Sequence, residues 1–238
     1  TDKNVGTYFG RMYQARYLSG LVAGKATKTN IIGYVAAHPI PEVIRGINAF
    51  TLGVRKVNPQ AKVKVIWTNT WFDPVREKEV ANTLLDAGAD VIAQHQDTPG
   101  PQQAAQERGK LSIGYNSDMS ALAPKAVMTS AIWNWGPYYV RTVEAVKNGT
   151  WKPEQYWGPM SDGIVDLAPF GPMVPEETKQ LVEEEKQKIL KGEWDVFTGP
   201  IKDQNGTVVV PEGQRMTDKE MLEMSWFVEG VEGTIPKS

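Results

Sequence analysis

The chain has no cysteine and only two histidines, His38 and His95, among its 238 residues. It therefore has neither disulfides nor thiolate metal sites, and two isolated histidines need carboxylate ligands beside them to hold zinc or iron. We predict no metal and no other cofactor. A lack of cysteine fits many compartments, the bacterial periplasm among them.

Long apolar runs and a surplus of charge of one sign are also missing. No run approaches the roughly 20 apolar residues of a membrane-spanning helix, and the opening residues have neither the basic start nor the apolar core of a signal peptide. The 26 Lys and Arg nearly balance the 28 Asp and Glu and form no stripe, so a phosphate backbone finds no electrostatic footprint. We expect a globular chain without a nucleic-acid partner.

Apolar strands and helix-like stretches alternate along the first part of the chain. Residues 31–37 form the near-continuous apolar run of a buried parallel strand, and Val80, Leu84 and Ala87 recur at helical spacing. The expected strands are 31–37, 63–67, 89–93, 111–114 and 127–131, and the expected helices are 13–25, 42–58, 75–87, 102–108 and 135–148. This alternation predicts a doubly wound parallel sheet.

The composition changes after residue 123. Residues 151–170 carry several glycines and prolines and predict loops. Residues 175–191 predict a helix, because glutamates come first and lysines last, as the helix dipole favours. Asn205-Gly206 predicts a tight turn before a strand at 208–210.

Three of the expected strands run directly into polar and aromatic residues, at 68–74, 94–98 and 115–118. In an open parallel sheet the carboxyl ends of the strands lie at one edge, and small ligands bind in the crevice beyond it. The sequence therefore predicts a small-molecule site built from these three clusters.

Six short runs, spread in order over nearly the whole chain, carry a family resemblance. They are Tyr17-Leu18-Ser19-Gly20, residues 32–42, Gly46-Ile47-Asn48-Ala49-Phe50, Trp71-Phe72-Asp73-Pro74, Gly114-Tyr115-Asn116-Ser117-Asp118 and Phe197-Thr198-Gly199-Pro200-Ile201. Together they resemble the basic membrane protein family, the substrate-binding proteins of ABC transporters that include bacterial purine-nucleoside receptors. The resemblance implies an α/β, bilobed type I periplasmic-binding-protein fold that closes on its ligand.

That family normally has further amino-terminal residues that build the first half of the amino-terminal lobe. The resemblance implies that residues 29–133 form a complete second lobe, and that 1–28 and 134–238 form the remaining part of an incomplete first lobe with the hinge crossings. Such a lobe exposes a sheet edge and apolar area, which favours completion by a partner chain or a domain-swapped dimer. We also expect this chain alone to bind its ligand weakly.

The resemblance assigns Trp71 to stacking on a purine, and a flat indole beside a polar turn suits that role. Alternation at a strand end is easily misjudged by one position, so Phe72 is the alternative exposed ring. Asn69 lies in the same polar turn. Asp118 lies where family carboxylates accept hydrogen bonds from the ligand, and Asn116 beside it can both donate and accept. Both residue types are also common helix caps, and the two roles can coexist.

Gln96 and Asp97 end the middle strand, where the family tends to have a glycine-rich turn. They either contact a smaller ligand directly or merely cap the next helix, and both interpretations remain open. His95, in the same turn, either hydrogen-bonds a base or has a local structural role.

Trp133 stands where nucleoside-binding relatives tend to place a lysine near the sugar. An indole offers one donor and a large apolar face, so the loss of the lysine favours a free base over a nucleoside. Packing between the lobes is the alternative for Trp133, and the main expectation for Trp135. Asp162 is a candidate that reaches the cleft from the later loop, although Asp-Gly most often makes a turn.

The function implied by the resemblance is that of a receptor for an ABC importer, binding a purine base or nucleoside without chemical change and passing it to a permease. It also implies a location in the periplasm or, as a lipoprotein, at the bacterial cell surface, with any signal and anchor cysteine upstream of Thr1.

The chain has no dinucleotide fingerprint, phosphate loop or nucleophile elbow. The alternatives are a ligand-sensing regulatory domain of the same fold and a nucleoside hydrolase in which Asp97 and Asp118 activate water.

Overall fold

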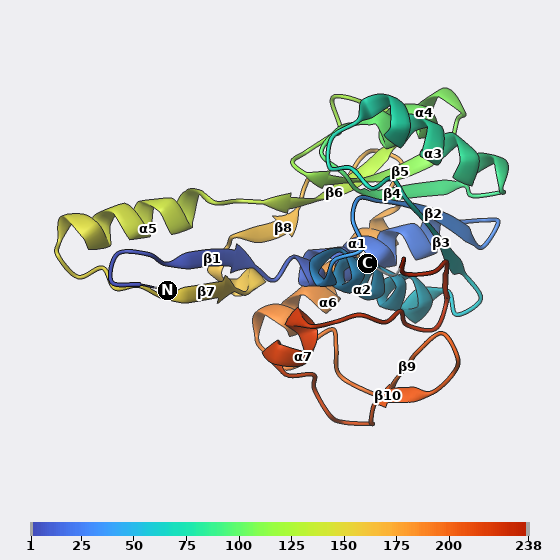
Figure 1. The fold of residues 1–238 in the computed structure, drawn as a ribbon. Helices are drawn as coiled ribbons and strands as arrows, with labels where there is room; N and C mark the ends of the chain where they lie inside the picture. Colours follow the sequence, from blue (N-terminus) through green and yellow to red (C-terminus); the bar gives the residue numbers. More distant parts are fainter. Residues whose placement is uncertain (1, 237–238) are drawn as a thin grey trace.

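A seven-stranded sheet forms the main body of the computed structural model, which describes residues 2–236 (Figure 1). In spatial order its strands are β11 (Val231–Glu232), β3 (Lys62–Trp67), β2 (Ile31–Ala36), β4 (Val91–His95), β5 (Leu111–Asn116), β6 (Val127–Trp133) and β8 (Val165–Leu167). Neighbouring strands are parallel except β8, which is antiparallel to β6. The strand order reverses beside β2, which leaves a crevice at the carboxyl edge.

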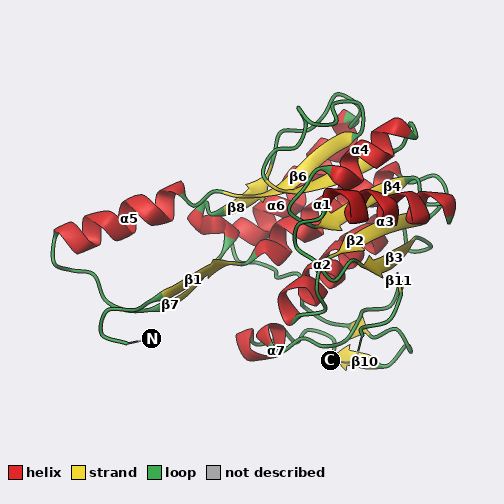
Figure 2. Ribbon diagram, turned by 45° about the horizontal axis from the view of Figure 1, so that its top comes forward, coloured by secondary structure: helices red, strands yellow, loops and turns green. Residues whose placement is uncertain are grey.

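Helices cover both faces of this sheet (Figures 1 and 2). On one face lie α1 (Met12–Ala26), α2 (Pro41–Val57) and α6 (Glu176–Leu190), and their apolar side chains share one core with β2 and β3. On the other face α3 (Pro74–Asp86) and α4 (Gly100–Glu107) pack on a second core around Val35 and Ile92. The predicted doubly wound sheet is confirmed.

Helices α1 and α2 pack closely because each presents a glycine to the backbone of the other. A Cβ added at Gly20 would lie 2.1 Å from the carbonyl oxygen of Phe50, and one at Gly53 would lie 2.1 Å from that of Tyr17. No larger side chain fits at these positions without moving a helix. This contact fixes α2 against the sheet, with its amino end at the carboxyl edge.

An arm projects from the main body where β6 ends (Figures 1 and 2). It consists of β1 (Thr7–Gly10), which pairs in parallel with β7 (Gln155–Gly158), and of α5 (Gly136–Lys147). On α5, Val140, Val143 and Val146 are each at least 60% exposed. The arm therefore carries an uncovered apolar helix face.

The carboxyl-terminal part adds short elements: η1 (Met160–Asp162), β9 (Ile201–Lys202), β10 (Val208–Val210) and α7 (Asp218–Leu222). β9 and β10 pair in antiparallel fashion around the predicted Asn205-Gly206 turn. Residues 151–170, predicted to be rich in loops, also contain the short strands β7 and β8, and β1, β11 and α7 were not predicted. Elements of two to five residues are too short for hydrophobic periodicity to reveal them.

The predicted second lobe, residues 29–133, supplies five of the seven strands of the main sheet. The other two, β8 and β11, come from outside that range. The division of the chain into two lobes stays a prediction. Over residues 2–236, no helix combines the length and the apolar character needed to cross a membrane.

Candidate functional site

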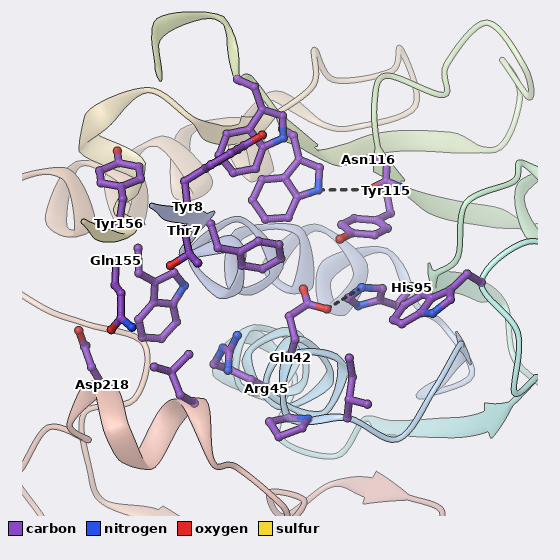
Figure 3. Close-up of a pocket in the computed structure, with 18 of the residues that line it drawn as sticks. Thr7, Tyr8, Glu42, Arg45, His95, Tyr115, Asn116, Gln155, Tyr156 and Asp218 are labelled. Carbon is purple, nitrogen blue, oxygen red and sulfur yellow. Dashed lines mark hydrogen bonds and ion pairs between the residues drawn. The ribbon is translucent and has the colours of Figure 1, made fainter. Parts of the chain in front are cut away.

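A cavity of about 1050 Å³ opens between the carboxyl edge of the main sheet and the arm (Figure 3). Eight of its 19 lining residues are aromatic: Tyr8, Phe9, Trp71, Tyr115, Trp133, Trp135, Tyr156 and Trp157. The ionisable or polar remainder is Thr7, Glu42, Arg45, His95, Asp97, Asn116, Gln155 and Asp218, and the aliphatic remainder is Ile40, Pro41 and Leu222. The site combines aromatic and aliphatic walls with convergent polar groups, as small-molecule sites commonly do.

The sheet edge supplies one wall, and the three predicted polar clusters meet there. Trp71 follows β3, His95 ends β4 with Asp97 just after it, and Tyr115 is the next-to-last residue of β5. The Asp97 amide donates a hydrogen bond to the Trp71 carbonyl oxygen over 3.1 Å, which ties two of the loops together. The His95 ring lies 4.4 Å from Tyr115 and 6.0 Å from Trp71, measured between centroids.

A chain of hydrogen bonds joins the sheet edge to the crossing into the arm. The Trp133 indole N–H donates to Asn116 Oδ1 over 3.1 Å, and Asn116 Nδ2 donates to Asp97 Oδ1 over 2.7 Å. Asn116 has φ of 70°, a left-handed conformation that asparagine tolerates better than most residues. Trp133 then stacks on Trp135, with ring centroids 4.9 Å apart and planes 13° from parallel.

Helix α2 brings Glu42 into the cavity, where its Oε2 lies 3.1 Å from His95 Nε2 (Figure 3). Burial lowers the pKa of His95, and the nearby Glu42 carboxylate, which acts to raise it, does not outweigh burial. Burial alone raises the pKa of Glu42, but the facing charges of His95, Arg16 and Arg45 outweigh it and bring that pKa below its ordinary value. His95 Nε2–H donates to the Glu42 carboxylate, which the surrounding groups keep ionised.

Arg16 lies directly behind this pair and is fully buried. Its NH1 donates to the Gln94 carbonyl oxygen over 2.6 Å, and its Cζ lies 3.9 Å from the ring centroid of Tyr115. Arg16 Nε and NH2 and His95 Nδ1 have no hydrogen-bond partner among the described residues. The positive charge of the buried Arg16 side chain favours the ionised form of the Glu42 carboxylate.

The arm and α7 supply the opposite wall. The guanidinium carbons of Arg11 and Arg45 lie 4.2 and 4.9 Å from the ring centroid of Trp157. Arg11 donates two hydrogen bonds, of 2.8 and 2.7 Å, to Asp218 on α7, and this partner lowers the pKa of Asp218. On the arm, Tyr156 donates to Asp162 over 2.5 Å, while burial followed by that hydrogen bond raises the pKa of Tyr156 to about 12.

Five of the ten residues predicted from sequence line the cavity: Trp71, His95, Asp97, Asn116 and Trp133. The other five do not: Asn69, Phe72, Gln96, Asp118 and Asp162. Trp135, for which packing was the main expectation, both lines the cavity and stacks on Trp133.

The five residues outside the cavity have other contacts. Gln96 is buried and donates to Thr68 over 2.6 Å, and Asp118 accepts from the Ser120 amide over 2.9 Å, as a local turn cap does. Phe72 is 69% exposed away from the cavity, and Asn69 occupies a left-handed turn with φ of 58°. Asp162 accepts a hydrogen bond from Tyr156, which lines the cavity. Their roles toward a ligand stay predictions.

Sequence reasoning missed the residues that α2, α7 and the arm bring to the cavity. Glu42 and Arg45 had a usable signal, because strand 31–37 also ends at the ligand-binding edge and the helix after it begins there. The arm residues had no such signal in the sequence, because they come from two four-residue strands that are far apart along the chain. Among residues 2–236 no three His, Asp or Glu side chains gather as a metal site would require.

Residues 1–196 match a family model, Bmp, described as ABC transporter substrate-binding protein PnrA-like. The chain is 43% identical over 237 residues to a purine-binding protein of Brucella abortus, aligning all of this chain with 67% of that protein. It is 44% identical to a putative ABC transporter glucose-binding protein of Haloferax volcanii, of which it covers 58%. The chain thus spans two thirds of the length of one curated relative and somewhat more than half of the other.

Solved structures share the fold at lower identity. A transcriptional activator from Bacillus halodurans superposes with a TM-score of 0.73 at 23% identity, over 81% of this chain and 68% of that one. A solute-binding protein of an ABC transporter system from Aeropyrum pernix gives 0.69 at 21% identity, over 84% of this chain and 66% of that one. The predicted periplasmic-binding-protein fold is confirmed.

Proposed function

The chain belongs to the Bmp family of ABC transporter substrate-binding proteins, as its sequence predicted, and from this premise we propose that it is an importer receptor for a purine base. The base is held in the cavity between sheet edge and arm and is passed unchanged to an ABC permease. The aromatic lining of the cavity carries this proposal, because flat heteroaromatic rings stack favourably on indole and phenol rings.

Trp71 is the proposed stacking platform. It is 38% exposed, while His38 and His95 support it at centroid distances of 5.0 and 6.0 Å. An indole that lines the cavity, is partly exposed and has two neighbouring rings beside it offers a preformed surface to a planar ligand. Asp97 and Asn116, which lie on the next loops along the edge, are the proposed readers of the ring's polar groups.

We favour a free base over a nucleoside because of Trp133. Its indole N–H is already bonded to Asn116, and its ring is packed on Trp135. The residue therefore offers a ribose no free donor of the kind that a lysine provides. Closure of the arm toward the sheet edge, with residues 134–135 as one crossing, is the proposed way in which the ligand is enclosed.

Glucose is the second candidate ligand, since one relative at 44% identity is named for binding it. Sugars also stack their apolar faces on aromatic rings, and Glu42, Asp97 and Gln155 could receive their hydroxyl groups. We place a purine first because eight aromatic rings line the cavity and a fully planar ring stacks on them best. A ligand-sensing regulatory domain is the alternative role on the same fold, and a linked permease gene separates the two. Hydrolysis of a nucleoside is the least favoured reading, because Asp118, one partner of the aspartate pair it needs, lies outside the cavity.

The cellular setting follows from the same premise. We place the protein in the periplasm or, as a lipoprotein, at the bacterial cell surface, where a permease receives its ligand. The exposed valines of α5 and the two-stranded sheet of the arm favour further polypeptide on that face, from a partner chain or a domain-swapped dimer.

Isothermal titration of adenine, guanine, hypoxanthine, adenosine, guanosine and glucose into the chain tests the proposal, with tryptophan fluorescence followed in parallel. We expect the bases to bind more tightly than the nucleosides or glucose and to be recovered unchanged. Tighter binding of glucose, release of a free base from a nucleoside, or silence with all six compounds would overturn it.

A further inference from the structure

Three carboxylates line the cavity, and they differ in how far the protein already uses them. Asp218 has both oxygens bonded to Arg11, whereas Asp97 accepts from Asn116 through Oδ1 alone. Glu42 uses only Oε2, toward His95. Among the described residues none donates to Glu42 Oε1, which points away from His95 in Figure 3. Glu42 and Asp97 therefore each keep a carboxylate oxygen without a donor among the described residues, and the surroundings of Glu42 distinguish it from Asp97.

The surroundings of Glu42 keep it charged and fixed. Its carboxylate faces His95, Arg16 and Arg45, and none of these is acidic. The His95 imidazole is itself wedged against Tyr115, so Oε2 has a rigid partner. An ionised carboxylate accepts hydrogen bonds and cannot donate them, so it attracts N–H groups and repels carbonyl oxygens.

We propose that Glu42 determines specificity by accepting a hydrogen bond from an N–H group on the edge of the heterocycle, with His95 as its positioning residue. This inference rests on the proposed function and adds to it the class of ligand: a flat heterocycle that presents an N–H donor. The layout supports both contacts at once, because His95 touches Glu42 on one side and the proposed stacking ring, Trp71, on the other.

The simplest alternative is that Glu42 only completes an ion pair at the start of α2. Glu77 provides a matched control, because it is likewise a carboxylate in the first turn of a helix, α3. Glu77 is fully buried, bonded to Thr98 and to the Asp73 amide, and lies outside the cavity. Glu77→Gln therefore changes a buried first-turn carboxylate that does not itself line the cavity.

The test is a titration of the unaltered chain, Glu42→Gln and Glu77→Gln with three ligands. These are adenine, adenine methylated on its imidazole nitrogen, and unsubstituted purine, which lacks the exocyclic amine. In the unaltered chain we expect one of the two analogues to bind roughly 10- to 100-fold more weakly than adenine, the range for a hydrogen bond to a charged group. Glu42→Gln should weaken adenine by a similar factor and abolish the difference between adenine and that analogue. Glu77→Gln should reproduce the unaltered pattern.

Equal affinity of the unaltered chain for all three ligands overturns the inference without any variant, so it stays falsifiable if Glu42→Gln fails to fold. An analogue penalty that persists unchanged in Glu42→Gln also overturns it and leaves the proposed function standing. If the unaltered chain binds none of the three, the proposed function falls, and this inference falls with it.

Discussion

Replacing Trp71 by alanine should weaken purine binding far more than the same change at its neighbour Phe72. Trp71 lines the cavity and is 38% exposed, whereas Phe72 is 69% exposed and lies outside the cavity. The two aromatic residues share a turn but not an environment. They therefore form a matched pair for asking which ring meets the ligand.

The exposed part of the indole sets the size of the effect. A tryptophan buries about 150–250 Å² when fully covered, so the 38% of Trp71 that is exposed corresponds to roughly 60–95 Å² available for stacking. At about 25 cal/mol per Å² this area contributes about 1.5–2.5 kcal/mol, within the range of about 1–3 kcal/mol for stacking a base on an aromatic side chain. Trp71→Ala should raise Kd roughly 10- to 60-fold, while Phe72→Ala should change it by no more than about twofold.

Titration calorimetry with adenine measures both variants, and thermal unfolding checks that each remains folded. Equal losses in the two variants, or a larger loss in Phe72→Ala, would refute the assignment of the stacking face. A loss in Trp71→Ala accompanied by unfolding at the assay temperature would be a stability effect, and in that case Trp71→Phe, which keeps a ring, must restore most of the affinity.

Three further outcomes follow from the packing and charges. Gly20→Ala should destabilise the fold by about 1–3 kcal/mol or more, because the new Cβ meets the Phe50 carbonyl oxygen at 2.1 Å; an unchanged Tm would contradict the helix packing. Because the pKa of His95 is lowered in the folded chain, the imidazole binds a proton more readily in the unfolded chain. The free energy of unfolding should therefore fall as the pH drops below about 6.5. Denaturant titrations at several pH values should show a smaller fall for His95→Asn. Trp133→Phe removes the donor to Asn116 and should weaken adenine binding roughly 2- to 10-fold; tighter binding would show that this bond restrains the site.

The main sheet was predictable because its strands are long, apolar and separated by helices with clear periodicity. Residues 31–37 and 111–114 match observed strands closely, and the helix at 175–191 is α6. The arm was not predictable, because β1 and β7 are four residues each and gain their pairing from residues nearly 150 positions apart. Local pattern carries no information on such a contact.

The candidate site divides in the same way. Trp71, Asp97 and Asn116 follow predicted strands, and the rule that ligands bind at the carboxyl edge was enough to bring them together. Which of two adjacent side chains faces inward, as for Trp71 and Phe72, depends on the path of a turn. Glu42 was overlooked because a glutamate in the first turn of a helix is expected there for reasons of the helix dipole alone.

The most direct test of the central claim is a structure of the chain determined with adenine bound. Our account predicts the ring stacked on Trp71 inside the cavity, with an N–H group within hydrogen-bond distance of the Glu42 carboxylate. Adenine bound elsewhere, or in the cavity but stacked on the arm with Trp71 uncovered, would contradict it.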